Sequence, residues 1–185
     1  MVATNSTMLP VGSKAPPFRL PDPRGNAVAL SDFPDARAVV IVFMCNHCPY
    51  VKAIEDRLLA LARDMQAKGA AFVAICANDP SDYPEDSPSA LLARWHEKSY
   101  PFPYLLDESQ DVARAFDAVC TPDIYLFDRT HKLRYRGRLD DSWRDPKKVQ
   151  KQELKMAIET VLQNLPVEGV QNSSMGCSIK WKKVD

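Results

Sequence analysis

The chain contains 185 residues, of which 45% are hydrophobic and 26% are charged, a composition typical of a globular domain. Its 24 basic and 24 acidic residues balance, so no net charge favours nucleic acid or an anionic membrane, and we expect neither as a partner. No apolar run approaches the roughly 18 residues of a membrane helix, and we see no signal peptide. Five cysteines, an odd number, argue against a disulfide-stapled secreted scaffold, so we expect a reducing, cytoplasmic location.

The first part of the chain predicts an extension, a hairpin and then a strand. Residues 1–13 are predicted to form a mobile lead-in. Residues 18–20 and 27–30 flank a turn rich in Pro, Asp and Gly, which is typical of a β-hairpin. Residues 39–44 form a short apolar run rich in β-branched side chains, as expected of a buried central strand. Apolar residues then recur at helical spacing as far as Met65, which indicates a helix of about four to five turns.

Strands and helices alternate in the rest of the chain. Further strands are predicted at 70–77, 124–127 and 133–135. Further helices are predicted at 89–98, 109–116 and 145–165, the last beginning with an Asp-Pro cap. The polar, proline-containing stretch 78–88 is predicted to be a loop, and residues 166–185 a tail that packs on the domain through Trp181. This order indicates an α/β fold with a mixed central sheet and helices on both faces.

Cys45 and Cys48 form a C-x-x-C where the predicted central strand gives way to a helix. Unpaired N–H groups and the positive end of the helix dipole would stabilise a thiolate on Cys45, and the thiolate is the form that attacks disulfides. We therefore expect Cys45 to be the nucleophile, more exposed than Cys48 and with a lowered pKa. Cys48 is then the resolving cysteine that releases a mixed disulfide. A zinc site would need two more ligands, and no second C-x-x-C or H-x-x-x-H exists, so we predict no metal and no organic cofactor.

Three other residues each have two interpretations. His47, directly before Cys48, either pairs with the Cys45 thiolate and raises the reduction potential, which we favour, or is exposed without a role. Cys120 and Cys177 are candidate auxiliary thiols that exchange with the dithiol. The alternative is that each is a buried cysteine that only packs.

A strand leading through C-x-x-C into a helix, with Thr121-Pro122 just before a late strand, resembles the thioredoxin superfamily. The resemblance implies a thioredoxin-like fold over residues 14–165, with the hairpin as an N-terminal extension. It also implies a cis Thr121–Pro122 bond opposite the dithiol. Substrate binding is then assigned to Asn46, Thr121 and Pro122, with the Thr121 backbone offering hydrogen bonds to a bound disulfide or peptide.

The segment from Gly12 to Leu20 resembles the added hairpin of the redoxin branch, which includes AhpC/TSA-like peroxiredoxins with antioxidant activity. More narrowly, Cys45-Asn46-His47-Cys48 and the segment around Cys177 resemble a little-characterised group of peroxiredoxin-like proteins. Peroxiredoxins carry a threonine three residues before their reactive cysteine and a proline seven residues before it. Here those positions are Val42 and Ala38, so the hydroxyl that orients peroxide is absent.

Together these features predict a thiol–disulfide oxidoreductase whose redox-active centre is a Cys45–Cys48 dithiol or disulfide bond. Its partners would be a disulfide-containing protein or small molecule and an electron donor that the sequence does not identify. Two alternatives stay open. One is a peroxiredoxin-like thiol peroxidase, and the other is a redox-sensing binding module that does not turn over.

Overall fold

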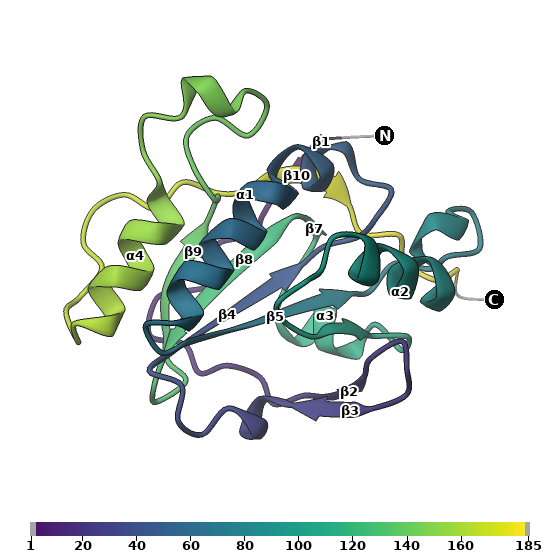
Figure 1. Ribbon diagram of the computed structural model, residues 1–185, viewed down its shortest axis with the longest axis horizontal. Coiled ribbons are helices and arrows are strands. Elements are labelled where there is room, and N and C mark those ends of the chain that lie inside the picture. The colour runs from purple at the N-terminus through teal and green to yellow at the C-terminus, as the bar shows by residue number, and fades with distance from the viewer. Residues whose placement is uncertain (1–2, 184–185) are drawn as a thin grey trace.

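The computed structural model describes residues 3–183, and at its centre lies a five-stranded mixed sheet (Figure 1). In spatial order the strands are β6 (Tyr104–Leu106), β5 (Ala70–Cys76), β4 (Ala38–Phe43), β8 (Asp123–Asp128) and β9 (Leu133–Gly137). β4 pairs in parallel with β5 and antiparallel with β8, which confirms the predicted mixed sheet. β4 is buried on both faces, which explains its unbroken run of apolar residues.

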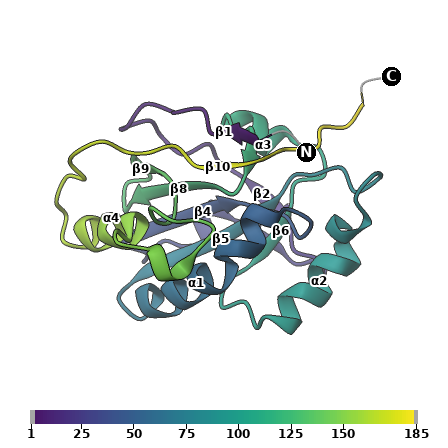
Figure 2. The ribbon, with the colours of Figure 1, turned by 90° about the horizontal axis from the view of Figure 1, so that it is seen from above.

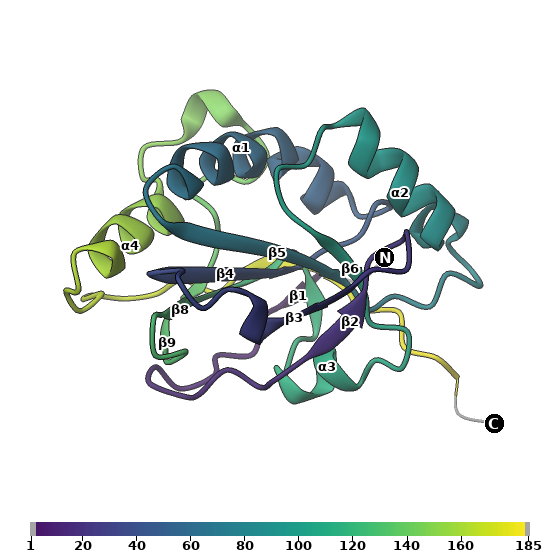
Figure 3. The same cartoon turned by 60° about the horizontal axis from the view of Figure 1, so that its bottom comes forward.

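Helices cover both faces of this sheet (Figure 3). Three lie on one face: α1 (Pro49–Gln66), α2 (Pro88–Glu97) and α4 (Glu153–Leu162). The other face is covered by α3 (Asp111–Ala115) and by the predicted hairpin of β2 (Arg19–Pro21) and β3 (Ala27–Ala29). Short 3-10 helices occupy Leu30–Asp32, Pro84–Asp86 and Pro146–Lys148. No helix within residues 3–183 is long and apolar enough to cross a membrane.

The helix expected from 145 to 165 is divided into two pieces. Asp145 does cap a turn, because its side chain accepts from the Lys147 N–H, but that turn is only a 3-10 helix. The Asp141 carboxylate then accepts from the backbone N–H groups of Gln150 and Lys151, at 2.9 and 3.1 Å. These bonds hold the chain outside a helical path, so α4 begins only at Glu153.

A second, three-stranded sheet joins both ends of the chain to the domain. Its order is β1 (Ala3–Asn5), β10 (Met175–Ser178) and β7 (Cys120–Thr121), all antiparallel. Figure 2 shows the C-terminal segment running from α4 across the molecule to β1. The expectation of a mobile lead-in at 1–13 is therefore wrong for residues 3–5, because β10 holds them by strand pairing; residues 1 and 2 lie outside the described part.

Two apolar residues near the end of the tail pack against the domain. Ile179 is buried, and its N–H donates to the Val119 carbonyl at 3.0 Å. Trp181 packs against the core with the Arg114 guanidinium 4.4 Å from the ring centroid. Residues 184 and 185 of the predicted tail lie outside the described residues.

Candidate active site

Cys45 and Cys48 lie between the end of β4 and the start of α1, facing the turn at Thr121. The Sγ of Cys45 is 3.3 Å from Thr121 Oγ1, and the Sγ of Cys48 is 3.1 Å from the Thr121 carbonyl oxygen. The Thr121–Pro122 peptide bond is cis, as the family resemblance implies. One residue thus contacts both sulfurs, through its side chain and its backbone.

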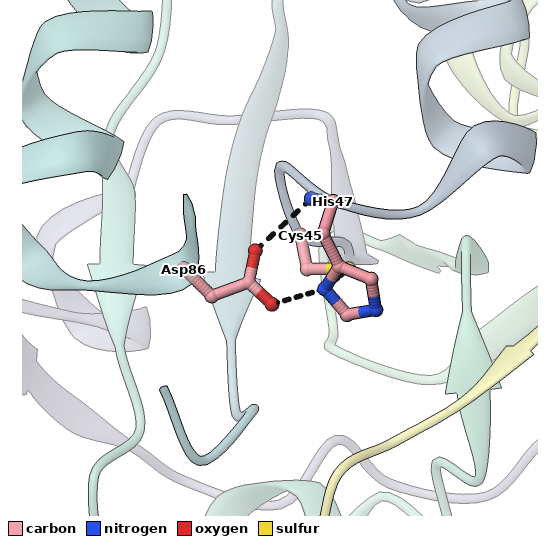
Figure 4. A group of neighbouring side chains, drawn as sticks. All are labelled: Cys45, His47 and Asp86. Atoms are coloured by element: carbon pink, nitrogen blue, oxygen red, sulfur yellow. Dashed lines mark hydrogen bonds and ion pairs between the residues drawn. The ribbon is translucent and has the colours of Figure 1, made fainter. Parts of the chain in front are cut away.

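The loop between the two cysteines is held by Asp86, which the sequence analysis did not single out (Figure 4). Its Oδ1 accepts from the N–H groups of Asn46 and His47, at 2.8 and 3.1 Å, and its Oδ2 lies 2.5 Å from His47 Nδ1. The Asn78 amide also donates to Oδ2, at 2.8 Å. Burial alone would raise the pKa of Asp86, but the hydrogen bonds from His47 and Asn78 lower it below its ordinary value.

The topology could have identified this carboxylate. β4 and β5 are parallel neighbours, so the loops that follow them meet at one edge of the sheet. The dithiol loop follows β4, and the loop containing Asp86 follows β5. The sequence predicts both strands and the loop at 78–88, whereas at the dithiol it predicts the start of a helix. Which of the acidic residues in 78–88 turns inward depends on packing, and only the structure identifies it.

His47 is buried, not exposed, which excludes the interpretation of a solvated side chain without contacts. Its Nδ1 lies 3.6 Å from Cys45 Sγ as well as beside Asp86, and its ring stacks on Tyr83 with centroids 4.1 Å apart. Nε2 is buried and bonds to no described residue. The imidazole is thus placed to influence the Cys45 sulfur, while the carboxylate of Asp86 and the ring of Tyr83 fix its orientation.

Asn46 was predicted to bind substrate, and its side chain is instead committed to the protein. The amide donates to the carbonyl oxygens of Glu85 and Ala90, at 3.0 and 3.1 Å. It therefore ties the dithiol loop to the 3-10 turn and to the first turn of α2.

The expectation that Cys45 is the more exposed cysteine is wrong, because both sulfur-bearing residues have 0% relative exposure. The helix also begins later than the sequence suggested: α1 starts at Pro49, so Cys48, not Cys45, is its N-cap. Burial raises the pKa of Cys45, whereas the hydrogen bond from Cys45, helped by Thr121 and the Val51 N–H, lowers that of Cys48 to about 5.

The reduced pair therefore holds one negative charge and one proton. With the proton on Cys45, its thiol donates to the Cys48 thiolate at the helix N-terminus. With the proton on Cys48, that thiol donates to the Thr121 carbonyl oxygen, and the Thr121 hydroxyl is placed to donate to a Cys45 thiolate. Transfer of a single proton between the two sulfurs interconverts these states.

Strand β10 occupies the backbone edge that was predicted to receive a substrate. Cys177 lies opposite Thr121 and Ser178 opposite Cys120 in the antiparallel register. Gly176 makes this approach possible, because a Cβ there would collide with the Thr121 carbonyl. In this structure the chain's own tail thus pairs with the Thr121 edge.

The two candidate auxiliary thiols differ in what they contact. Cys177 is buried, and its side chain forms a hydrogen bond with Cys48. The Cys120 thiol is directed instead to the Pro122 carbonyl oxygen, 3.8 Å away. Burial raises the pKa of both, that of Cys177 to about 12. Cys76 is also buried, and burial raises its pKa.

Cys45, His47 and Asp86 together offer sulfur, nitrogen and oxygen ligand atoms within 4.8 Å of one another. Closed structural zinc sites have four protein ligands, and this group among the described residues has three. His47 Nδ1, the nitrogen facing the other two groups, is already hydrogen-bonded to Asp86.

A pocket of about 970 Å³ lies next to this group, between the 78–88 loop and residues 179–183. It reaches Asp86 and Tyr83 from the surface, and neither cysteine of the dithiol lines it.

Comparison with known proteins places this arrangement in context. Residues 11–136 match the model of the AhpC/TSA family. The chain is 48% identical to an uncharacterized conserved protein from Geobacillus kaustophilus, covering 100% of this chain and 99% of that one with a TM-score of 0.94. It is 39% identical to a hypothetical protein from Sinorhizobium meliloti 1021, covering 97% and 98%, with a TM-score of 0.93.

The fold itself is also found in more distant structures. The thioredoxin domain of a thiol-disulfide oxidoreductase from Bacteroides vulgatus is 22% identical, with coverage of 70% of this chain and 89% of that one and a TM-score of 0.57. This likeness confirms the thioredoxin-like fold that the sequence predicts. No curated protein matches the chain.

Proposed function

Because the chain belongs to the AhpC/TSA family of thiol-based redox proteins, we propose that it is a thiol–disulfide oxidoreductase using Cys45 and Cys48. The observation that carries the proposal is the contact of both sulfurs with Thr121, the residue of the cis Thr121–Pro122 bond. A disulfide-forming pair beside a backbone edge suits exchange with an extended chain that carries a disulfide.

In the first step Cys45 transfers its proton to the Cys48 thiolate and attacks the substrate disulfide. The substrate S–S bond breaks, a bond forms between Cys45 and one substrate sulfur, and the other substrate sulfur leaves as a thiolate. The Cys48 thiol produced by this transfer donates to the Thr121 carbonyl oxygen, which lies 3.1 Å away. The Thr121 hydroxyl, 3.3 Å from Cys45, stabilises the attacking thiolate.

In the second step Cys48 loses its proton to the departed substrate thiolate and attacks the Cys45 sulfur. The mixed disulfide breaks, the Cys45–Cys48 bond forms, and the second substrate sulfur leaves with the electron pair. Two electrons have then passed from the dithiol to the substrate. The position of Cys48 at the N-terminus of α1 suits this step, because the helix N-terminus stabilises the thiolate that attacks.

Asp86 and His47 act as positioning residues in this scheme. Asp86 fixes the loop through the Asn46 and His47 N–H groups, and it holds the imidazole 3.6 Å from Cys45. Interactions of this kind that stabilise the reduced form raise the reduction potential.

Reduction of insulin disulfides with dithiothreitol as electron source tests the proposal. Wild type is expected to turn over, Cys45→Ser to be inactive, and Cys48→Ser to stop at a mixed disulfide visible by mass spectrometry. Cys76→Ala, a change at a buried cysteine assigned no redox role, is the control and is expected to retain activity. Turnover by Cys45→Ser equal to wild type, or a wild type without activity toward insulin and oxidised glutathione alike, would contradict the proposal.

Thiol peroxidase activity is a second candidate, supported by one contact. Val42 supplies no hydroxyl for a peroxide, but the Thr121 hydroxyl lies 3.3 Å from Cys45 and offers one from the opposite side. A hydroperoxide would transfer its terminal oxygen to Cys45 as the O–O bond breaks, giving a Cys45 sulfenic acid and an alcohol. Cys48 would then attack the Cys45 sulfur, forming the disulfide and releasing water. Hydroperoxide consumption by wild type distinguishes the two candidates, and Thr121→Val, which keeps the backbone carbonyl and loses the hydroxyl, is expected to lower that consumption.

A further inference from the structure

The tail strand β10 stands where a substrate strand would stand. It pairs antiparallel with β7, places Cys177 opposite Thr121, and lies with β1 on its other side. Beyond the strand, the Lys180 N–H donates to Asn78 Oδ1 at 2.9 Å, and the Asp79 N–H donates to the Lys180 carbonyl at 2.8 Å. The chain is therefore held on both sides of Cys177, and the residue's position against the dithiol is fixed.

Cys177 is also in direct contact with one sulfur of the dithiol. Its thiol shares a hydrogen bond with Cys48, whose sulfur also meets the Thr121 carbonyl oxygen and the Cys45 thiol. Cys120, on the neighbouring strand, directs its sulfur to Pro122 instead. Of the two extra cysteines on this sheet, Cys177 is the one in hydrogen-bond contact with a redox sulfur.

From these two observations we propose that Cys177 is a third redox cysteine, which attacks the Cys45–Cys48 disulfide at the Cys48 sulfur. This inference rests on the proposed function, since that reaction supplies the disulfide. The Cys177 sulfur attacks the Cys48 sulfur, the Cys48–Cys177 bond forms, and the Cys45–Cys48 bond breaks. Cys45 leaves with the electron pair and accepts the proton lost by Cys177, so no external oxidant or reductant is consumed.

The exchange has a consequence for the cycle. It returns Cys45 to the thiol state while the protein still holds one disulfide, now between α1 and the tail. It also links β10 covalently to the helix at the Thr121 edge. The oxidised protein then exists in two isomeric forms that differ in whether Cys45 or Cys177 is reduced.

Peptide mapping of the full chain tests this. Wild type is equilibrated in buffers of reduced and oxidised glutathione, quenched in acid, alkylated and digested, and its disulfide-linked peptides are quantified. We expect both a Cys45–Cys48 and a Cys48–Cys177 link in the oxidised buffers. The second link is expected to disappear in Cys177→Ser and to persist in Cys120→Ser, the matched control from the adjacent strand. In Cys45→Ala, where the competing link cannot form, Cys48–Cys177 is expected to be the main disulfide.

Two results would overturn the inference. One is a wild type that forms only Cys45–Cys48 in every buffer. The other is a Cys45→Ala protein, folded by circular dichroism, in which Cys48 carries glutathione while Cys177 is fully alkylated. In both cases insulin reduction by wild type would leave the proposed function standing. If wild type instead forms no Cys45–Cys48 disulfide in any buffer, the proposed function fails, and the inference fails with it because its disulfide is not supplied.

Discussion

Cys177 lies directly opposite Thr121 in the antiparallel β7–β10 pair, so the tail covers the residue that contacts both sulfurs of the dithiol. Both Cys45 and Cys48 are fully buried beneath this arrangement. A macromolecular disulfide can reach Cys45 only when part of this cover moves.

Weakening the β7–β10 contact is expected to expose the dithiol. In Gly176→Ala the new methyl group would meet the Thr121 carbonyl, a clash of the overpacking kind that costs about 1–3 kcal/mol. We expect Cys45 and Cys48 to alkylate several-fold faster than in wild type, measured by iodoacetamide labelling and mass spectrometry. Val170→Ala, a change at a 90% exposed position of the same tail, is the control. Equal labelling rates in all three proteins would show that β10 does not limit access.

The dithiol is expected to ionise well below the ordinary cysteine pKa of about 8.5. The first thiolate should form near pH 5, because the Cys45 thiol and its neighbours stabilise negative charge on Cys48. A lowered folded-state pKa means that this ionisation stabilises the reduced fold above about pH 8.5, and the contribution is lost as the pH falls toward 5. Thiolate ultraviolet absorbance against pH measures the transition. Cys45→Ala should move it to higher pH and Cys76→Ala should not; an unmoved transition in Cys45→Ala would exclude the proposed hydrogen bond as its cause.

Replacing His47 is expected to make the dithiol a better reductant. His47→Ala removes an imidazole 3.6 Å from Cys45, and a loss of 1.4 kcal/mol from the reduced form corresponds to about 30 mV. We therefore expect a potential more negative by tens of millivolts, measured by equilibration with glutathione. His96→Ala, at an exposed histidine, serves as the control. A potential unchanged by His47→Ala would leave the imidazole a packing role only.

Asp86 is expected to stabilise the fold in a pH-dependent way. Asp86→Asn weakens three contacts to the dithiol loop, and the expected loss of unfolding free energy is about 1–3 kcal/mol near neutral pH. Because the folded-state pKa of Asp86 is lowered, its contribution is present above the ordinary aspartate value of about 3.9 and is lost as the pH falls through the lower folded value. Urea unfolding of wild type, Asp86→Asn and the exposed-site control Asp82→Asn across this range measures it. Parallel pH profiles for wild type and Asp86→Asn would contradict the assignment.

The cis Thr121–Pro122 turn was predicted from the family resemblance. The sequence by itself determined the central strand, the dithiol, the helix that follows and the hairpin. Local patterns are enough for these features: β-branched runs, helical spacing and proline positions describe contacts between residues near one another in the chain. The predicted strands and most of the helices accordingly lie within a few residues of the observed ones. The helix start was displaced, however, from Cys45 to Pro49, and that shift moved the helix N-cap to Cys48.

Only the tertiary structure decided which distant residues meet the dithiol. Asp86 lies 39 residues from His47, in a loop whose composition does not distinguish it from its acidic neighbours. Cys177 reaches Cys48 because β10 pairs with β7, and Gly176 permits that approach through the absence of a side chain. Strand pairing between distant segments and the inward turn of one carboxylate depend on the packed chain as a whole. They leave no local pattern in the sequence, whereas the strand and the helix show a periodic pattern and the dithiol a C-x-x-C motif.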